Sequence, residues 1–369
     1  MYKVCHMTSA HAPEDERIFF KECMSLAANG YETYLVARGS SYEKNGVHIV
    51  GVGEIPASRR KRMTEGARKV YEAAKAINAD MYHFHDPELL PYGLKLKKAG
   101  KKVIFDSHED TAQQIMEKTW IPALVRIPVH HIFAAYQRHI CRHLDAVVSV
   151  TPHLCDSFRQ FSERVEMITN YPSLEPLPDR TAARLDTLCF AGGIADQWCH
   201  REIIAAMERC LGCTYVLCGD LDSDYGQALR QMPGWKQVDY VGRIPHEQVH
   251  DLLGRCGMGA SLLKPSRNSG FQLGTMGNTK IFEEMMAGLP IICTNFILWR
   301  EFVERCHCGI CVEPSNIDEI ANAISYLLDH PDEARQMGEN GRRAVEQQFN
   351  WGVEEKKLLA LYNDILNDK

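Results

Sequence analysis

The chain has 369 residues, of which 45% are hydrophobic and 24% are charged, and its formal net charge is −6. This length suits two domains, and this composition excludes collagen, coiled coil and disorder. The negative net charge argues against general nucleic-acid binding, which requires a strongly basic face. No stretch reaches the roughly 18 apolar residues of a membrane span, and the N-terminus lacks a secretory leader pattern, so we expect a cytoplasmic protein.

Residues 1–170 alternate between short apolar runs and segments of helical period, which predicts a parallel sheet covered by helices. The expected strands are residues 3–7, 32–37, 47–51, 81–85, 102–106, 146–150 and 165–169. The expected helices are residues 17–29, 58–76, 91–98 and 124–142. A proline-rich stretch at residues 170–178 then indicates a linker.

The same alternation restarts after the linker. The expected strands are residues 187–191, 214–219, 238–241, 258–263, 290–294 and 309–312. The expected helices are residues 201–210, 246–256, 280–287 and 317–330, with a helical tail from 331 that is interrupted at 350–351. We therefore predict two doubly wound Rossmann-like α/β domains, with ligand at the carboxyl ends of the strands in the cleft between them.

The charge is divided unevenly between these domains. Residues 1–170 hold 23 Lys and Arg against 20 Asp and Glu, which gives +3, and residues 171–369 hold 19 against 28, which gives −9. Basic runs at 59–62, 68–69 and 95–102 suit an anionic membrane surface, but solvated helix faces explain them equally well. The apolar segment 120–129 suits either insertion into lipid or a place in the core, and we favour partial burial at the cleft edge.

Fourteen cysteines are spread along the chain, mostly within apolar runs, so we expect reduced thiols that pack as small hydrophobic groups. Cys306, His307 and Cys308 stand together, with Cys311 close behind. On an extended strand these neighbours point to opposite faces and a second ligand pair is missing, so an apolar strand with a turn is favoured. No metal site is predicted.

Polar residues follow two neighbouring strands of the first domain. Alternation places His83 and His85 on one face, while Asp86 and Pro87 have the types of a helix N-cap and first turn. Asp106, Ser107 and His108 repeat the arrangement at the next strand end. The carboxyl ends of parallel strands hold ligands in this fold class, so His108 is a candidate site residue.

In the second domain, a helix start at residues 277–283 combines glycine, Asn278, Thr279 and Lys280. Free N–H groups and a lysine at such a start suit an anion, and Glu283 suits sugar hydroxyls. We expect the neighbouring Glu284 to face solvent. No phosphate-binding GxxxxGK[ST] motif is present, and the GxG at residues 51–53 lacks a third glycine, which disfavours a P-loop NTPase or a dehydrogenase.

Seven motifs in order resemble glycosyltransferase family 4, the retaining nucleotide-sugar transferases of the GT-B fold, in a bacterial polysaccharide-assembly subgroup. They are TSAHAPEDERIF at 8–19, HFHDPELLP at 83–91, VIFDSHED at 103–110, NYP at 170–172, FAGGI at 190–194, YVGRIP at 240–245 and NTKIFE at 278–283. This resemblance implies an acceptor-binding domain at 1–170, completed by a C-terminal helix at 351–369 that crosses back, and a donor-binding domain at 171–350.

The resemblance also implies roles for individual residues. His108 corresponds to the catalytic cleft histidine, Glu283 to the carboxylate that holds the ribose, and Lys280 to a diphosphate contact. The further donor residues implied are Gly193, Arg201, Arg243, Ile244, Lys264, Asn278 and Thr279, and the acceptor residues are His11, Arg17, His85, Asp86 and Glu88. The implied co-substrate is a UDP- or GDP-sugar, with no cofactor or metal required.

Two positions depart from the family pattern. Thr275 stands where members often have a first glutamate, and Gly193 stands where many have an arginine. The expected activity is the retaining transfer of a sugar to a glycan or lipid-linked acceptor in cell-surface polysaccharide synthesis. A nucleotide-sugar epimerase and a non-catalytic two-lobed sugar-nucleotide-binding protein remain as alternatives.

Overall fold

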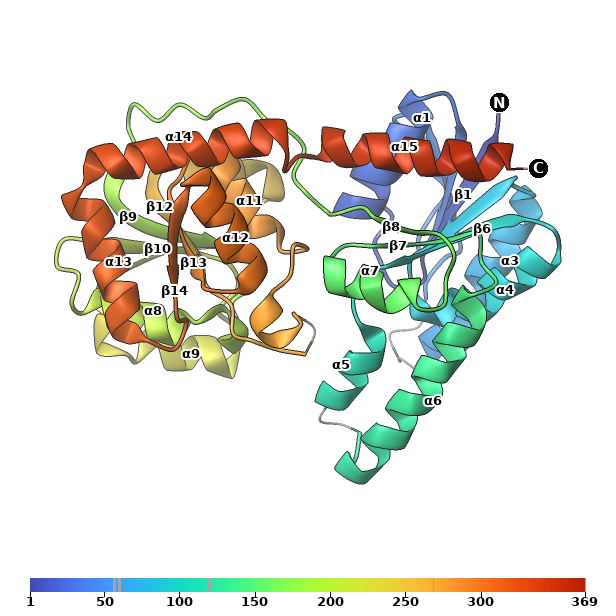
Figure 1. Ribbon diagram of the computed structural model, residues 1–369, viewed down its shortest axis with the longest axis horizontal. Coiled ribbons are helices and arrows are strands. Elements are labelled where there is room, and N and C mark those ends of the chain that lie inside the picture. The colour runs from blue at the N-terminus through green and yellow to red at the C-terminus, as the bar shows by residue number, and fades with distance from the viewer. Residues whose placement is uncertain (56–57, 59–60, 119–120, 268, 369) are drawn as a thin grey trace. The chain divides into compact units, whose positions relative to one another are not determined.

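The computed structural model describes residues 1–55, 58, 61–118, 121–267 and 269–368. The chain forms two compact units (Figure 1), unit 1 from Met1–Asn170 and Trp351–Lys369, and unit 2 from Tyr171–Asn350. The boundaries between the units, after Asn170 and after Asn350, are those that the sequence analysis expects between its two domains. No helix within the described residues has the length and apolar character needed to cross a membrane.

Unit 1 contains an eight-stranded sheet in the order β3-β4-β2-β1-β5-β6-β7-β8. The strands are β1 Lys3–Met7, β2 Glu32–Ala37, β3 Tyr42–Lys44, β4 Val47–Gly51, β5 Met81–Phe84, β6 Lys102–Ser107, β7 Ala146–Ser149 and β8 Val165–Met167. All neighbours pair in parallel except β3 and β4, which pair antiparallel. The helical segments are η1 Glu16–Cys23, α1 Met24–Ala28, η2 Arg62–Gly66, α3 Ala67–Ile77, η3 Pro87–Leu89, α4 Leu90–Lys98, α5 Thr111–Glu117, α6 Ala123–Cys141, α7 Pro152–Arg159 and α15 Trp351–Asn367.

Unit 2 contains a six-stranded parallel sheet in the order β11-β10-β9-β12-β13-β14. The strands are β9 Arg184–Ala191, β10 Thr214–Cys218, β11 Val238–Gly242, β12 Cys256–Ser261, β13 Ile291–Thr294 and β14 Gly309–Val312. The helical segments are η4 Asp196–Trp198, α8 His200–Met207, α9 Asp224–Arg230, η5 Pro233–Gln237, η6 His246–Gln248, α10 Val249–Gly254, η7 Phe271–Leu273, α11 Thr279–Met286, α12 Ile297–Cys306, α13 Ile317–Asp329 and α14 Pro331–Gln347.

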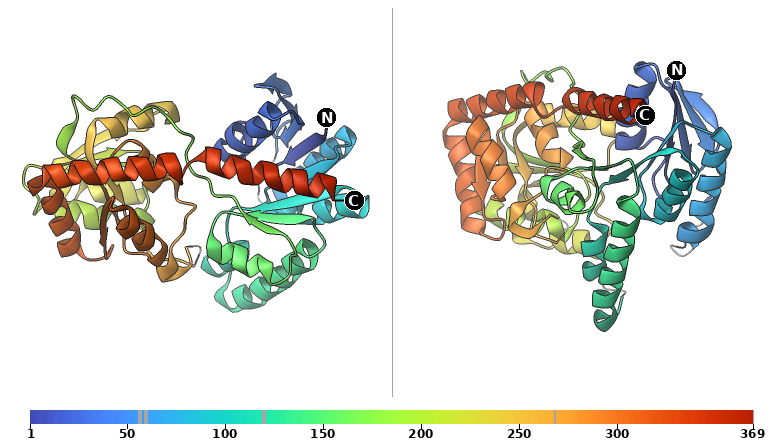
Figure 2. Two further views of the ribbon diagram at one scale, coloured as in Figure 1. Left: turned by 45° about the horizontal axis from the view of Figure 1, so that its top comes forward. Right: turned by 45° about the vertical axis from the view of Figure 1, so that its right-hand side comes forward.

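Helices cover both faces of each sheet, so the central strands are buried on both sides, as their nearly continuous apolar sequences require. The C-terminal helix α15 belongs to unit 1, where it lies along the sheet (Figure 2) and buries Leu358, Tyr362 and Ile365 against residues of β1 and β5. This burial holds the far end of the chain to the first strand of the protein.

The predicted strands are all present, and the doubly wound architecture is confirmed. The sequence analysis missed β3 and four short helices, α5, α7, α9 and α12, because elements of three to ten residues carry little periodic signal. The expected helix at residues 58–76 includes residues 59–60, which lie outside the described residues. Gly288 follows the end of α11 with a φ of 75°, the left-handed conformation that glycine commonly adopts just after a helix.

The expectation for the cysteine-rich segment was partly wrong. Cys306 is the last residue of α12, and His307 takes a left-handed conformation with a φ of 51°, so Cys306 and His307 do not lie on a strand. Each of the fourteen cysteines is a free thiol, and twelve are buried. Cys293 and Cys311 oppose each other on β13 and β14, with their sulfur atoms 3.7 Å apart.

Candidate functional site

The strand order reverses direction at one point in each sheet. In unit 1 this point lies between β1 and β5, and in unit 2 it lies between β9 and β12. Loops that leave such neighbouring strands diverge to opposite faces, and they leave space for a ligand beyond the carboxyl ends of the strands. The polar residues that the sequence analysis singled out collect at these two edges.

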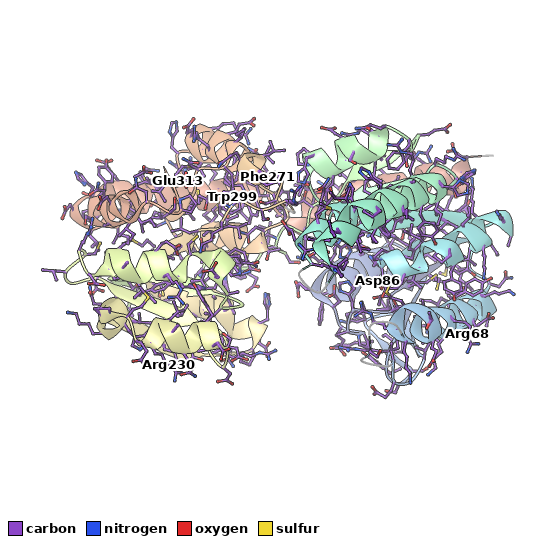
Figure 3. All side chains as sticks on the ribbon, turned by 90° about the horizontal axis from the view of Figure 1, so that it is seen from below. Arg68, Asp86, Arg230, Phe271, Trp299 and Glu313 are labelled. Carbon is purple, nitrogen blue, oxygen red and sulfur yellow. The ribbon has the colours of Figure 1, made fainter. Side chains whose placement is uncertain are left out.

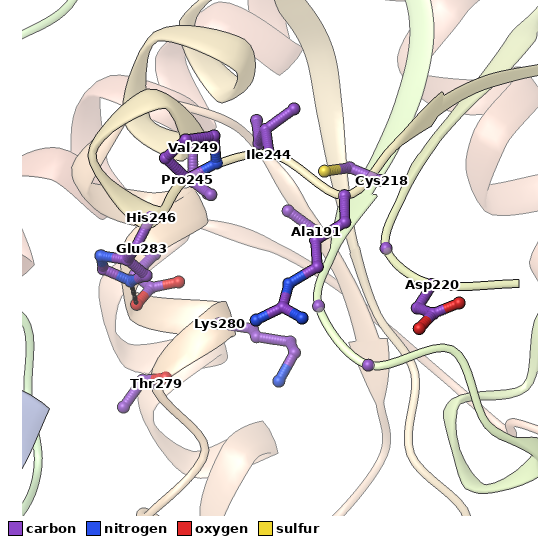
Figure 4. A pocket seen from close by; sticks show the side chains of 14 residues that line it. Ala191, Cys218, Asp220, Ile244, Pro245, His246, Val249, Thr279, Lys280 and Glu283 are labelled. Carbon is purple, nitrogen blue, oxygen red and sulfur yellow. Dashed lines mark ion pairs between the residues drawn. The ribbon is translucent and has the colours of Figure 1, made fainter. Parts of the chain in front are cut away.

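The edge of unit 2 contains a pocket of about 770 Å³ (Figure 4). Glu283 and His246 stand on one side of it and Asp220 on the other, and His246 Nε2 lies 3.5 Å from Glu283 Oε1. The lining residues are Ala191, Gly192, Gly193, Cys218, Gly219, Asp220, Arg243, Ile244, Pro245, His246, Val249, Thr279, Lys280 and Glu283. The structure thus brings together six of the predicted donor residues, Gly193, Arg243, Ile244, Thr279, Lys280 and Glu283.

Two consecutive glycines after β9 have different surroundings. A Cβ atom on Gly192 would lie 2.2 Å from Cε of Lys280, whereas a Cβ atom on Gly193 would meet nothing within 4 Å. Gly192 therefore lets the lysine side chain pass directly over the backbone. Gly193 leaves open space where an arginine side chain would otherwise stand.

Lys280 lies at the start of α11, where Asn278 Oδ1 accepts a hydrogen bond from the Lys280 backbone N–H. Its ammonium nitrogen lies 4.3 Å from the centre of the Trp198 ring, within the range of a cation–π interaction. Burial lowers the pKa of Lys280, while the nearby Glu283 and Glu284 oppose this shift. A phosphate group in the pocket would stabilise the charged amine and relieve that desolvation.

The two glutamates of α11 have opposite environments. Glu283 lines the pocket, whereas Glu284 is only 2% exposed, so the expectation that Glu284 faces solvent was wrong. Ser261 Oγ donates a hydrogen bond to Glu284 Oε2 over 2.8 Å, and a Cβ atom on Gly259 would collide with this carboxyl group. Burial raises the pKa of Glu284 to about 8, so the group stays neutral in the fold at neutral pH.

Three predicted donor residues do not line this pocket. Arg201 places its guanidinium 5.2 Å from the ring centre of Tyr225, and Lys264 pairs with Asp196 at 2.9 Å and with Glu202 at 3.2 Å. Asn278 acts indirectly, as the cap of α11. Thr275, at the position of the missing first glutamate, accepts a hydrogen bond from Trp299 Nε1 at its carbonyl oxygen.

The edge of unit 1 is filled with charged and polar side chains. Asp106, at the end of β6, accepts a hydrogen bond from Arg17 Nε over 2.8 Å, and His108 Nε2 lies 3.2 Å from the same oxygen. His85 Nδ1 lies 3.3 Å from His108 Nε2. Burial alone would raise the pKa of Asp106, but Arg17 and His108 hold it well below its usual range. The predicted acceptor residues Arg17 and His85 thus meet His108 around one carboxylate.

Exposure separates residues that can touch a substrate from those that cannot. The side chains of His108 and His11 are 20% and 32% exposed, whereas those of Arg17 and His85 are 4% and 0% exposed. Glu88 is also buried, and it forms an ion pair with Arg62 at 3.0 Å. Arg17, His85 and Glu88 therefore support the edge from below, and His108 and His11 form its open surface.

Asp86, labelled in Figure 3, holds a loop and does not cap a helix. It stands at the N-cap position of η3, but its side chain makes no capping hydrogen bond. Instead, Asp86 Oδ2 accepts hydrogen bonds from Thr8 Oγ1 and from the backbone of Ser9. The predicted N-cap position of Asp86 and the proline at the helix start are thus confirmed, but the Asp86 carboxylate bonds to the loop after β1 and not to the helix.

The sequence analysis missed several side chains at these edges, among them Asp220 and His246 of the pocket. His6 and Glu22 are buried beside His85 in unit 1, and Trp198 covers Lys280 in unit 2. His6 pairs with His83 in the register of β1 and β5, so a prediction of the strand order would have been needed to find it. Glu22 and Trp198 lie on the helical segments η1 and η4. The sequence pattern does not determine toward which side of the segment these side chains point.

Two sequence families match separate parts of the chain. Residues 16–171 match the family described as Glycosyltransferase Family 4, and residues 200–344 match the family described as Glycosyl transferases group 1. The first match lies within unit 1 apart from its last residue, and the second lies within unit 2. Together they include His108 and Asp106 of the unit 1 edge and Lys280 and Glu283 of the unit 2 edge, whereas His11, Gly192 and Gly193 lie outside the matched ranges.

Characterised relatives match over different lengths. The D-rhamnosyltransferase WbpZ of Pseudomonas aeruginosa is 21% identical, over 90% of this chain and 87% of its own. The MMP alpha-(1->4)-mannosyltransferase of Mycolicibacterium hassiacum is 32% identical, but over 27% of this chain and only 23% of its own length.

Solved structures share the fold over the whole chain. Sucrose-phosphate synthase from Thermosynechococcus elongatus has a TM-score of 0.78 at 18% identity, with all of both chains covered. HepE of Anabaena, solved in complex with UDP and glucose, has a TM-score of 0.73 at 13% identity, covering 99% of this chain and 100% of its own. At these identities the likeness concerns the fold.

Proposed function

Because the chain belongs to the family 4 glycosyltransferases of the GT-B fold, we propose that it transfers a sugar, with retention of configuration, from a nucleoside diphosphate sugar. The acceptor in this proposal is a glycan or a lipid-linked saccharide of a cell-surface polysaccharide. The observation that carries the proposal is the pocket of unit 2, in which Lys280 and Glu283 face the glycine turn after β9.

The donor nucleotide occupies this pocket in our proposal. The carboxylate of Glu283 accepts hydrogen bonds from the ribose hydroxyls, and the segment from Arg243 to Val249 borders the base. The diphosphate lies over Gly193, where a Cβ atom would meet nothing within 4 Å, and beside the Lys280 side chain that passes over Gly192. UDP and GDP are both candidates, because relatives include GDP-mannose-dependent mannosyltransferases and the fold neighbours include UDP complexes.

Lys280 stabilises the leaving group. When the bond between the sugar and the phosphate breaks, negative charge grows on the nucleoside diphosphate, and a preorganised cation lowers the barrier to this step. Lys280 is held in place by Gly192 below it and by the ring of Trp198 beside it, so it needs little reorganisation. The N-terminus of α11 adds the positive end of its dipole.

Unit 1 binds the acceptor in this proposal, through the exposed surface of His108 and His11. Asp106 fixes the orientation of the His108 ring, and Asp15 lies 3.1 Å from His11 Nδ1. We assign no covalent nucleophile to these residues. We propose a front-face transfer, in which the acceptor attacks from the side of the departing phosphate and this phosphate helps to deprotonate the acceptor hydroxyl. Their role is to orient this hydroxyl.

We also propose that helix α6 contacts an anionic membrane that carries the lipid-linked acceptor. Its side chains Leu124, Ile127 and Ile132 are 93%, 54% and 69% exposed. The helix contains Arg126 and Arg138 but no acidic residue. Apolar side chains with flanking cations are typical of interfacial helices. The basic runs contribute less, since Lys97 is paired with Asp145 at 2.7 Å, while residues 59–60 lie outside the described residues.

A binding experiment tests the donor site first. The thermal midpoint of the protein is measured against UDP, GDP, ADP and dTDP sugars and the free diphosphates, and repeated with Glu283→Ala and Lys280→Ala. We expect a stabilising shift from one nucleotide that both variants lose, because bound ligand stabilises the folded state. Lys264→Ala is the matched control, since this lysine lies outside the pocket.

A product assay then distinguishes the transferase from its alternatives. With the nucleotide identified, transfer to a saccharide acceptor that requires His108 supports the proposal. Conversion of the donor without an acceptor identifies an epimerase, and binding without any turnover identifies a non-catalytic protein.

Vesicle flotation tests the membrane contact separately. The double variant Leu124→Asp with Ile132→Asp should lose binding to vesicles that contain anionic lipid. Leu211→Asp, a change at an 87% exposed leucine of unit 2, should keep it. Equal vesicle binding by both variants would contradict the proposal that α6 contacts the membrane.

A further inference from the structure

Four potential metal ligands meet inside unit 1, beneath the surface formed by His108 and His11. They are His6 on β1, His83 on β5, His85 just after β5, and Glu22 in η1. Each is at most 3% exposed, and their ligand atoms all lie within 4.8 Å of one another. Three separate segments of the chain therefore converge on one small volume.

The contacts of Glu22 with the three imidazoles are too long for direct hydrogen bonds and suit ligands of a common ion. Glu22 Oε2 lies 3.6 Å from His6 Nδ1, 3.8 Å from His85 Nε2 and 4.0 Å from His83 Nδ1, and it has no hydrogen-bond partner. His6 Nδ1 and His85 Nε2 are 3.0 Å apart. These distances bracket the roughly 3.4 Å between neighbouring ligands of a tetrahedral zinc ion, which follows from bonds of about 2.1 Å.

Two of the imidazoles also have the outer partners that metal-bound histidines usually have. The opposite nitrogen of His6, Nε2, lies 3.0 Å from the hydroxyl of Tyr362. The same hydroxyl lies 2.9 Å from His83 Nδ1, so a metal ion bound at this nitrogen would replace that hydrogen bond. The opposite nitrogen of His85, Nδ1, lies 3.4 Å from Asp106 Oδ2. Such partners fix the tautomer and direct the remaining lone pair of each ring at the centre of the cluster.

Glu22 offers the cluster one oxygen that no hydrogen bond uses. Arg17 Nε lies 3.1 Å from Glu22 Oε1 and 2.8 Å from Asp106 Oδ2, so the guanidinium contacts the other oxygen of Glu22 and leaves Oε2 facing the imidazoles. A buried oxygen without a hydrogen-bond partner is costly, and a bound cation would satisfy it.

We propose that His6, Glu22, His83 and His85 bind a divalent transition metal ion, with zinc as the ion that three imidazoles and one carboxylate suit best. Four protein ligands and complete burial leave no position for substrate, so the site is structural. It joins β1, β5 and η1 and, through His85 and Asp106, supports the ring of His108. This site goes beyond the proposed transfer reaction and does not depend on it.

Metal analysis of the purified protein tests the proposal. The full chain is produced without a polyhistidine tag in zinc-supplemented medium, and its content of zinc, iron, manganese, cobalt, nickel and copper is measured by mass spectrometry. We expect about one ion per chain in the wild type, and loss of the ion in Glu22→Gln and His85→Asn. The matched control is His48→Asn, whose side chain in β4 is 42% exposed and should not affect binding.

If the variants fail to fold, measurements on the wild-type protein alone test the proposal. Growth with cobalt in place of zinc should then give the visible absorption bands of four-coordinate cobalt bound to nitrogen and oxygen. Wild-type protein that contains far less than one transition metal ion per chain and lacks these bands overturns the proposal. So does a folded Glu22→Gln variant that retains the full metal content, because the carboxylate would then not be a ligand.

Discussion

The space beyond β1 and β5 in unit 1 is filled with side chains that can ionise, whereas the space beyond β9 and β12 in unit 2 is open. Unit 1 buries Arg17, Glu22 and Asp106 there, and unit 2 places Gly192 and Gly193 at the corresponding turn. The strand order around these two points is the same. The comparison teaches that strand order determines where a ligand site lies, while the residues just after the strands determine whether it is a pocket or a packed polar cluster.

Removal of the guanidinium from the filled edge should have the largest effect. Arg17→Met leaves Asp106 buried without its guanidinium partner, so we expect the free energy of unfolding in urea to fall by about 3–5 kcal/mol. Arg68→Met, a change on the exposed face of α3, should alter it by less than about 0.5 kcal/mol. Equal effects of the two changes would contradict the assigned charge network.

A buried carboxyl group in unit 2 should make stability depend on pH. The pKa of Glu284 rises from 4.5 to about 8 through burial, so between these values the folded chain binds a proton that the unfolded chain has released. Stability should therefore fall as pH rises from about 5 to 8, by up to about 1.4 kcal/mol per pH unit, and level off above that. Urea unfolding of Glu284→Gln across this window should lack this contribution, and an unchanged slope would show that Glu284 is ionised in the fold.

The glycine turn of the open edge offers a matched pair of variants. Gly192→Ala places a methyl group against Cε of Lys280 and displaces the amine, so we expect nucleotide affinity to fall by about tenfold, or about 1.4 kcal/mol. Gly193→Ala adds the same group in open space and should bind almost as the wild type does. Calorimetric titration with the preferred nucleoside diphosphate measures both, and equal affinities would remove Lys280 from the site.

The smallest effect is expected from Lys264. Its ion pairs with Asp196 and Glu202 lie at the surface, where solvent screens them, so Lys264→Met should change the free energy of unfolding by at most about 1 kcal/mol. The nucleotide affinity of this variant should stay close to that of the wild type. A loss as large as that of Lys280→Ala would place the diphosphate nearer to Lys264 than we propose.

The sequence analysis predicted the strands, the domain boundaries and the pocket residues of unit 2 better than it predicted the side-chain cluster at the edge of unit 1. Glycines and Lys280 at a helix start are local features, so position along the chain suffices to identify them. The partners of Asp106 come from separate segments, and Arg17 and Glu22 reach it only through the rotation of η1, which no short motif specifies. For the same reason Glu284 was expected to face solvent: the adjacent Gly259, which leaves room for its carboxyl group, lies 25 residues away in the sequence.

The central claim is that unit 2 provides the nucleotide site while the edge of unit 1 is already filled. Amide hydrogen exchange, measured with and without the preferred nucleoside diphosphate, tests it most directly. We predict slower exchange in residues 191–193, 218–220, 243–249 and 279–283 of unit 2, and no change in residues 83–88 and 106–108 of unit 1. Protection confined to the segments of unit 1 would contradict the account.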